Sequence, residues 1–331
     1  MKNSNKQNGT FVISLDFELL WGVHDHETKE SFRQQILGAR TAVDTMLKLF
    51  DRHQIHATWG IVGMLMAESK EELQSYFPTL KPQYEKAALS SYGYMDDVGA
   101  DEQNDEFHYA HSLIKKIQEY PNQEIASHTF SHYYCKQPGQ TKETFEADLY
   151  AAQRIAKEKF GVELKSLILP RNHFVGDYIE SACKAGFCVV RGNPKSFAYN
   201  KSSMLARAFR FVDTYIGICG RKTYVMKADA NIQAVNVKAS TFFRKYNTRL
   251  AFFEKYKVAH IKREMKYAAK NGEVYHLWWH PHNVGENTAL CMAQLGEIFA
   301  YYQTLQEKYG FDSKTMYEAA EEIRNENSDV M

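Results

Sequence analysis

The feature that most constrains the fold is a repeated succession of an amphipathic helix, a glycine and a short apolar strand. In residues 141–160 apolar side chains recur at helical spacing, Thr141 can cap the start, and Gly161 follows before the strand SLILP. CKAGFCVV and AKNGEVYHLWW repeat this punctuation, residues 31–53 lead as a helix into IHATWGIVG, and EIASH adds a further strand. Helices alternating with continuously apolar strands predict a parallel sheet buried on both faces. Such a sheet forms a barrel or a doubly wound fold.

Two stretches interrupt this alternation. Residues 64–120 include SYGYMDDVGADEQND, which is typical of a surface loop, and residues 192–272 end in a long helix-like run. Because α/β barrels often span ~250 residues or more as one unit, we interpret both stretches as insertions in a single barrel domain over residues 1–331.

The charge of the chain is balanced overall but uneven along it. The net charge of +1 argues against a nucleic-acid partner. Residues 192–272, however, hold 17 lysines and arginines against four acids. The plainer interpretation is a set of solvated helix faces. The alternative is a surface for phosphate, an acidic glycan or an anionic membrane, which would give peripheral membrane contact.

Location signals are weak in this sequence. The first ten residues are polar, and no apolar run approaches the roughly 18 residues of a membrane helix. The five cysteines form no CxxC pair and suit a reducing compartment. We therefore expect a cytoplasmic protein without a membrane span.

Polar side chains follow several of the predicted strands. Asp16 and Glu18 end FVISL, His128 follows EIAS, Arg171 follows SLILP, and His280 follows YHLWW. In a barrel the carboxyl ends of the strands meet on one face. These ends therefore predict a shared site.

The stretch SHTFSH suggests a metal. On a helical turn His128 and His132 would face the same way and could bind one Zn²⁺ or similar ion. On an extended strand Asp16 and Glu18 share a face, and two acids on an otherwise apolar strand call for a nearby cation. The alternative is a strand end at which both acids meet water.

Together these segments resemble the NodB-type polysaccharide deacetylases (carbohydrate esterase family 4). The resemblance extends over roughly residues 11–282 and is nearest to a branch associated with surface-polysaccharide biosynthesis. The matching motifs are Asp16-Phe17-Glu18, His128-Thr129-Phe130-Ser131-His132, Arg171-Asn172-His173-Phe174 and Leu277-Trp278-Trp279-His280.

The family resemblance implies a distorted (β/α) barrel of about seven parallel strands that removes an acetyl group from an N-acetylated sugar with the help of a divalent metal, zinc being the first expectation. Glu18, His128 and His132 would bind the metal and Asp16 would be the general base. The second aspartate of the family motif is replaced by Phe17, so Asp16 can also take the place of Glu18 as ligand.

The resemblance also implies three further catalytic roles. Arg171 would orient the base, the backbone N–H of Phe174 would hold the oxyanion, and His280 would be the general acid.

We expect the substrate to be a carbohydrate, carried on a lipid or a nucleotide. Trp278, Trp279 and Tyr133 are predicted to contact it, although alternation along the strand places one tryptophan in the core. Two alternatives stay open: a related barrel hydrolase of a non-sugar amide, and a non-catalytic glycan-binding protein with a degenerate site.

Overall fold

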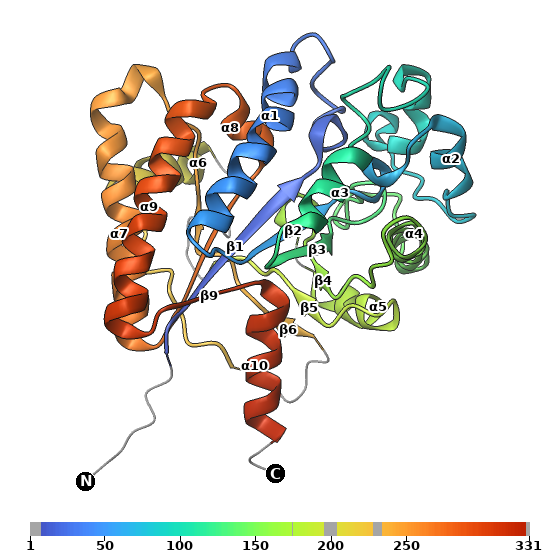
Figure 1. Ribbon diagram of the computed structural model, residues 1–331. Coiled ribbons are helices and arrows are strands. Elements are labelled where there is room, and N and C mark those ends of the chain that lie inside the picture. Colours follow the sequence, from blue (N-terminus) through green and yellow to red (C-terminus); the bar gives the residue numbers. More distant parts are fainter. Residues whose placement is uncertain (1–7, 174, 195–203, 228–233, 329–331) are drawn as a thin grey trace.

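The computed structural model describes residues 8–173, 175–194, 204–227 and 234–328. Within these ranges nine strands form one parallel sheet. Eight strands follow the order β6-β5-β4-β3-β2-β1-β8-β7, and β9 pairs with β1. The sheet curls into a half-barrel with helices packed around it (Figure 1). The predicted distorted barrel is confirmed, with more strands than the seven expected.

The elements alternate along the chain as the sequence predicts. The strands are β1 (Thr10–Phe17), β2 (Ala57–Ile61), β3 (Gln123–Ser127), β4 (Ser166–Leu167), β5 (Val189–Val190), β6 (Val235–Asn236), β7 (Thr241–Phe242), β8 (Val274–Trp279) and β9 (Asp312–Lys314). The helices are α1 (Arg33–Arg52), α2 (Lys70–Ser75), α3 (His111–Glu119), α4 (Lys142–Phe160), α5 (Ile179–Lys184), α6 (Met204–Ile216), α7 (Ala251–Asn271), α8 (Pro281–Gly285), α9 (Thr288–Tyr309) and α10 (Met316–Ser328).

Helix α4 shows how local sequence sets these boundaries. The Thr141 side chain accepts a hydrogen bond from the Thr144 backbone N–H, and the Thr144 hydroxyl accepts one from the Thr141 backbone N–H. This capping box satisfies donors that the first turn would otherwise leave unpaired. The helix ends at Gly161, whose φ of 68° lies in the left-handed region that glycine adopts without strain. The predicted start and end of this helix are confirmed.

Strand β1 lies in the middle of the sheet. All eight of its residues are buried, and it pairs with β2, β8 and β9. Burial on both faces explains its continuously apolar sequence. Because the strands are parallel, the carboxyl ends of β1, β3, β5 and β8 open on one face, which therefore collects the polar residues that follow these strands.

The two interrupting stretches have different structures. Residues 64–120 contain short helical turns, α2 and α3, whereas the described part of 192–272 contains α6, two short strands and the long helix α7. Among the described residues, no helix combines the length and apolar character needed to cross a bilayer.

Candidate metal centre and active site

The loop that carries the two histidines is not helical. It follows β3 directly, and both Thr129 and His132 have left-handed backbone angles, with φ of 64° and 56°. The prediction of a helical turn was therefore wrong. The loop nevertheless turns both imidazoles toward Glu18, which lies just beyond the end of β1.

Three potential ligand atoms meet at this point. The Glu18 Oε2 atom lies 3.2 Å from His128 Nε2 and 3.1 Å from His132 Nε2. All three side chains are at least 95% buried, and together they form a group that could hold a metal ion. Tetrahedral zinc bonds of about 2.0–2.2 Å place ligand atoms roughly 3.3–3.5 Å apart. The observed spacing thus fits such an ion with little adjustment.

The hydrogen bonds of the histidines favour a cation at the same place. His128 Nδ1 donates to the Ile168 carbonyl oxygen at 2.9 Å, so the ring in its neutral form presents the lone pair of Nε2 to the Glu18 carboxylate. Burial lowers the pKa of His132 to about 4 against the opposing effect of Glu18. Electron pairs that face one another in a buried site are unfavourable unless a cation lies between them.

The carboxylate of Glu18 stays ionised in this setting. Burial would raise its pKa, but His280, His128 and His132 together hold the pKa well below its ordinary value. The side chain also needs the space left by Gly22, because a Cβ there would lie 2.1 Å from Glu18 Cδ. An ionised, positioned carboxylate is the form that binds a divalent ion.

Asp148 of α4 holds the backbone of the histidine loop in place through hydrogen bonds. Its carboxylate accepts from the Phe130 backbone N–H at 2.7 Å, from the Ser131 backbone N–H at 3.2 Å and from the Ser131 hydroxyl. Tyr92 donates a further bond at 3.1 Å. The sequence analysis missed this residue, although an acid among the buried positions of an amphipathic helix was a signal that it has a specific partner.

Asp16, the last-but-one residue of β1, is clamped by an arginine. Arg191, which follows β5, makes two bonds to it, Nη1–Oδ1 at 2.5 Å and Nη2–Oδ2 at 2.7 Å. Both side chains are 2% exposed. Burial would raise the pKa of Asp16, but Arg191, with His128 and His280, keeps it below the ordinary value. Asp16 is therefore an ionised, fixed carboxylate.

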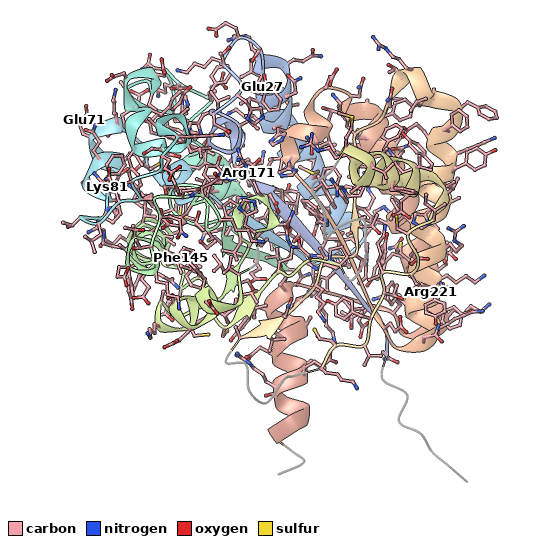
Figure 2. The ribbon with its side chains drawn as sticks, turned by 180° about the vertical axis from the view of Figure 1, so that it is seen from behind. Glu27, Glu71, Lys81, Phe145, Arg171 and Arg221 are labelled. Carbon is pink, nitrogen blue, oxygen red and sulfur yellow. The ribbon has the colours of Figure 1, made fainter. Side chains whose placement is uncertain are left out.

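This clamp corrects the expected role of Arg171. Arg171 instead forms an ion pair with Asp25 at 2.6 Å and covers the Tyr134 ring at 4.3 Å. The neighbouring residue Asn172 reaches the clamp, since its Oδ1 accepts from Arg191 at 2.9 Å. Arg171 remains close to the site and lies near the middle of the face seen in Figure 2. The expected oxyanion donor, Phe174, lies outside the described residues.

Arg191 was not predicted as a site residue, although the sequence contains a signal for it. Like His128 and Arg171, Arg191 is a polar residue directly after an apolar strand, here CVV. Its side chain stacks over Trp278 at 4.5 Å and also bonds Ser14 at 3.0 Å.

His280 lies between the two carboxylates. Its Nε2 is 3.7 Å from Asp16 Oδ2 and 3.7 Å from Glu18 Oε1, and its Nδ1 is 3.1 Å from Asn283 Oδ1. Because the amide oxygen accepts, Nδ1 carries the proton there, and Asn283 is the hydrogen-bond partner of His280. With a side chain 22% exposed, His280 is the histidine of the site that solvent reaches most easily.

The flanking histidines are buried. His276 bonds Ser14 through Nε2 at 2.8 Å, on the far side of the Arg191 clamp. His282 stacks on His280 with ring centroids 4.9 Å apart, and burial lowers its pKa to about 3. Both are neutral groups that support the site, because burial lowers their pKa values to about 3.

The predicted aromatic contacts divide between core and surface. Trp279 and Tyr133 are fully buried, and the Tyr133 hydroxyl bonds Thr141 and Thr144. Neither side chain can reach a substrate in this structure, which corrects two of the three assignments. Trp278 is partly exposed and lines a cavity, so one tryptophan of the pair packs in the core, as predicted.

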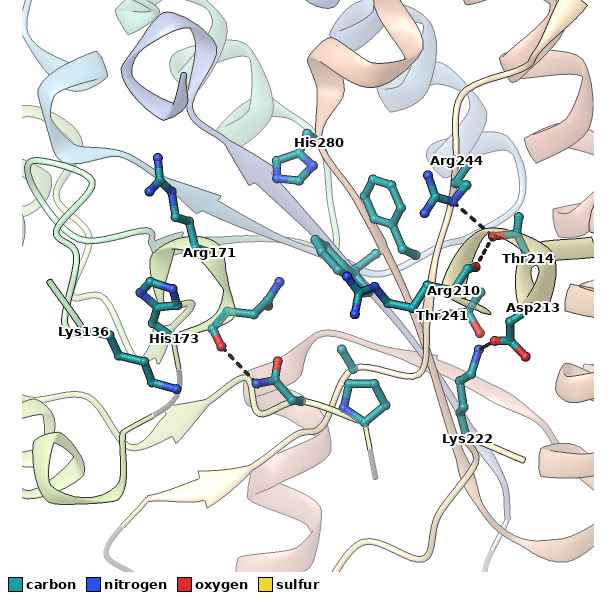
Figure 3. A pocket seen from close by; sticks show the side chains of 16 residues that line it. Lys136, Arg171, His173, Arg210, Asp213, Thr214, Lys222, Thr241, Arg244 and His280 are labelled. Carbon is teal, nitrogen blue, oxygen red and sulfur yellow. Dashed lines mark hydrogen bonds and ion pairs between the residues drawn. The ribbon is translucent and has the colours of Figure 1, made fainter. Parts of the chain in front are cut away.

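Two neighbouring cavities, which share some of their lining residues, open over these residues. The smaller, about 280 Å³, is bordered by Asp16, Glu18, His132 and His280. The larger, about 580 Å³, shares Arg171, Asn172 and His280 with it. Five of the sixteen residues that line the larger cavity are lysine or arginine and one is an acid (Figure 3). Arg171 is paired with Asp25 and Lys222 with Asp213, so a molecule that reaches His280 from this side passes a wall with an excess of positive charge from Lys136, Arg210 and Arg244.

Comparison with known proteins identifies the domain. Residues 37–190 match the family model described as polysaccharide deacetylase. No curated protein sequence matches the chain.

Solved structures share the fold at low sequence identity. A protein from Mycobacterium smegmatis described as a candidate polysaccharide deacetylase is 14% identical with a TM-score of 0.60, over 99% of this chain and 94% of that chain. A 4-alpha-glucanotransferase from Thermococcus litoralis is 11% identical with a TM-score of 0.50, over 90% and 38%. A family 4 carbohydrate esterase from Streptomyces lividans, in complex with acetate, is 9% identical with a TM-score of 0.43, over 90% of each chain. At these identities the first two likenesses show the fold alone, and nothing is concluded from the third.

The family match and the site geometry coincide in the chain. The matched segment contains the His128–His132 loop and Arg171, while β1 and β8 on either side bring Asp16, Glu18 and His280 to it. Residues 37–190 therefore match the polysaccharide deacetylases, and this match supports a carbohydrate deacetylase of the NodB type.

Proposed function

We propose that the protein is a metal-dependent hydrolase of the N-acetyl C–N bond of an N-acetylated sugar. The observation that carries this proposal is the meeting of Glu18, His128 and His132 at ligand spacing, beside the clamped carboxylate of Asp16. Two nitrogens and one oxygen suit zinc first and other divalent ions less well. These residues would hold the ion, which would supply the Lewis acidity that makes hydroxide available at neutral pH.

The protein's own groups perform the proton transfers. Asp16 takes a proton from the attacking water while the water oxygen forms its bond to the acetyl carbon. Arg191 keeps this carboxylate ionised and oriented beforehand. His280 then gives a proton to the sugar nitrogen as the C–N bond breaks, which leaves acetate and a free amine. General-base assistance of this kind contributes ~10²–10⁴-fold in rate.

The larger cavity supports a substrate that carries phosphate. Its wall brings together Lys136, Arg171, Arg210, Lys222 and Arg244 (Figure 3). Guanidinium groups bind phosphate oxygens in pairs and hold their charge at any physiological pH. A sugar linked to a lipid or a nucleotide through phosphate fits this wall, whereas a neutral polymer would leave it unused. The link to surface-polysaccharide biosynthesis and the cytoplasmic location stay predictions.

Metal analysis of the purified protein tests the proposal. We expect about one divalent ion per chain, its loss in His128→Ala and its retention in His53→Ala, a control histidine near the end of α1 that bonds Gln303 instead. The variant Asp16→Asn should keep the ion but lose acetate release by about 10²-fold or more. A protein that binds no ion would support the non-catalytic glycan-binding alternative.

Substrate comparison separates the remaining alternative. Acetate release from N-acetylglucosamine derivatives supports the deacetylase, and ring opening of cyclic amides without acetate release would support the hydrolase of a non-sugar amide. Faster turnover of phosphate-linked than of free N-acetylglucosamine would support the role of the cationic wall.

A further inference from the structure

Helix α6 is amphipathic, but its apolar face points to solvent. Met204, Leu205 and Ile216 are 86%, 68% and 57% exposed, and Phe211 and Val212 are exposed as well. At 100° per residue these five positions fall on one continuous side of the helix. The buried positions include the polar residues Asp213 and Thr214. This arrangement reverses the usual one, in which the apolar stripe faces the core.

The start of α7 adds a second exposed apolar group next to α6. Phe252 and Phe253 are 67% and 49% exposed, and they contact one another and Tyr256. Tyr215 of α6 donates a hydrogen bond to Glu254 of α7 at 3.3 Å, which joins the two helices. We call the exposed apolar residues of both helices the α6–α7 face. In Figures 1 and 2 these helices lie together at one side of the molecule, opposite the side that carries α2.

The charges around the α6–α7 face have one sign. The described acids of residues 192–272, Asp213, Glu254 and Glu264, are all buried and paired with Lys222, Lys257 and Arg221. The exposed charged residues of the same described stretch are all cations: Arg207, Arg221, Lys227, Lys245, Arg249, Lys255, Arg263, Lys266 and Lys270. Arg221 is paired with Glu264 and Lys245 with Glu286, and the other seven are not matched by an exposed acid of the same described stretch. The surface therefore combines exposed aromatic and aliphatic side chains with an excess of positive charge.

We propose that the α6–α7 face docks on the surface of an anionic lipid bilayer. A helix with an apolar side and basic flanks binds at the bilayer interface, where apolar side chains enter the headgroup boundary and cations meet lipid phosphates. A second copy of this chain is a poorer partner, because the two faces would bring like charges together. Exposed apolar surface of this extent on one helix side is itself typical of an interaction site.

Helix α6 also borders the larger cavity. Arg210, Asp213 and Thr214 of α6 contribute to its wall, so the helix that contacts the bilayer also borders the entrance to the active site. These three residues lie on the side of α6 opposite its exposed apolar side chains, so docking through the apolar side leaves this wall of the cavity uncovered.

Vesicle flotation tests the proposal without relying on catalysis. The wild-type protein is mixed with vesicles of phosphatidylcholine alone or with added phosphatidylglycerol. We expect binding that depends on phosphatidylglycerol and weakens with salt. Phe252→Ser/Phe253→Ser should weaken it at least tenfold. Arg207→Gln/Arg249→Gln should weaken it about thirtyfold, from roughly 1 kcal/mol per cation.

Matched controls lie outside the face. Leu80→Ser removes a side chain that is 55% exposed, and Lys86→Gln removes an exposed cation; both should bind vesicles like the wild type. All variants should release acetate from a water-soluble N-acetyl sugar at wild-type rates, which shows that they are folded and keeps this test separate from the proposed chemistry.

Three results would overturn the proposal. They are equal binding to both vesicle types, binding that the face variants leave unchanged, and a dimer in sedimentation equilibrium that Phe252→Ser/Phe253→Ser abolishes.

Discussion

The pairing of Asp16 with Arg191 predicts that loss of Arg191 destabilises the protein more than loss of Arg171, the arginine that the motif resemblance assigned to Asp16. The variant Arg191→Met leaves a buried carboxylate without its partner, because both side chains are almost fully enclosed. Removing one partner of such a pair costs about 3–5 kcal/mol of the free energy of unfolding. The same change at Arg171, whose side chain is 33% exposed in its pair with Asp25, should cost about 1 kcal/mol or less.

The difference in the free energy of unfolding between the wild type and Arg191→Met should depend on pH. In the wild type the pKa of Asp16 lies below the ordinary value of 3.8, so its contribution to stability is present above about pH 4 and is lost as the pH falls through the folded-state pKa. In Arg191→Met, burial raises the pKa of Asp16, and the variant loses stability as the pH rises through it. The gap between the two proteins should therefore be widest near pH 7 and narrow toward pH 3.

Urea unfolding followed by circular dichroism at several pH values measures this gap. The pH dependence of acetate release supplies a second reading, because a base with a raised pKa moves the acidic limb of the rate profile to higher pH. The reasoning is refuted if Arg171→Met shifts that limb and Arg191→Met does not.

Three other changes test separate parts of the site. Gly22→Ala places a Cβ against the ligand carboxylate and should weaken zinc binding in calorimetry about tenfold or more, whereas Gly176→Ala, where a Cβ meets nothing within 4 Å, should not. Burial raises the pKa of Asp148 to about 6, so the free energy of unfolding of the wild type should fall by on the order of 3 kcal/mol as the pH rises from about 4 to 6. Asp148→Asn should lack this pH dependence in urea unfolding, and an unchanged pH dependence would contradict the raised pKa of Asp148. Trp279→Ala should cost about 3–5 kcal/mol of stability because its ring is buried, while Trp278→Ala should instead raise KM for the sugar; the opposite pattern would reverse their roles.

The fold was predictable because its signal is local. Continuous apolar strands, the Thr141 cap and Gly161 each report on a few neighbouring residues, and all point to the same alternating architecture. The number of strands was not predictable, since β4 to β7 are only two residues long and leave little pattern in the sequence.

The ligands were predictable from position, but their geometry was not. Glu18, His128 and His132 each follow a strand, and parallel strands bring such residues to one face. The spacing of the two histidines suggested a helical turn, whereas the left-handed backbone at Thr129 and His132 is sustained by bonds from Asp148, eighteen residues beyond Phe130. A contact between residues eighteen positions apart produces no periodic pattern in the sequence from which it could be predicted.

The choice of arginine was likewise a tertiary effect. Arg171 and Asn172 both have left-handed backbone angles, with φ of 54° and 51°. This turn sends Arg171 to Asp25 and Asn172 to the clamp, so the motif arginine is displaced and Arg191 takes the expected bond.

Anomalous diffraction from a crystal soaked in zinc examines the metal centre itself. We expect one strong peak about 2.0–2.2 Å from a Glu18 carboxylate oxygen and from the Nε2 atoms of His128 and His132, with Asp16 still held by Arg191. Crystals that show no zinc near these three side chains, or that show it bound elsewhere, would contradict the account.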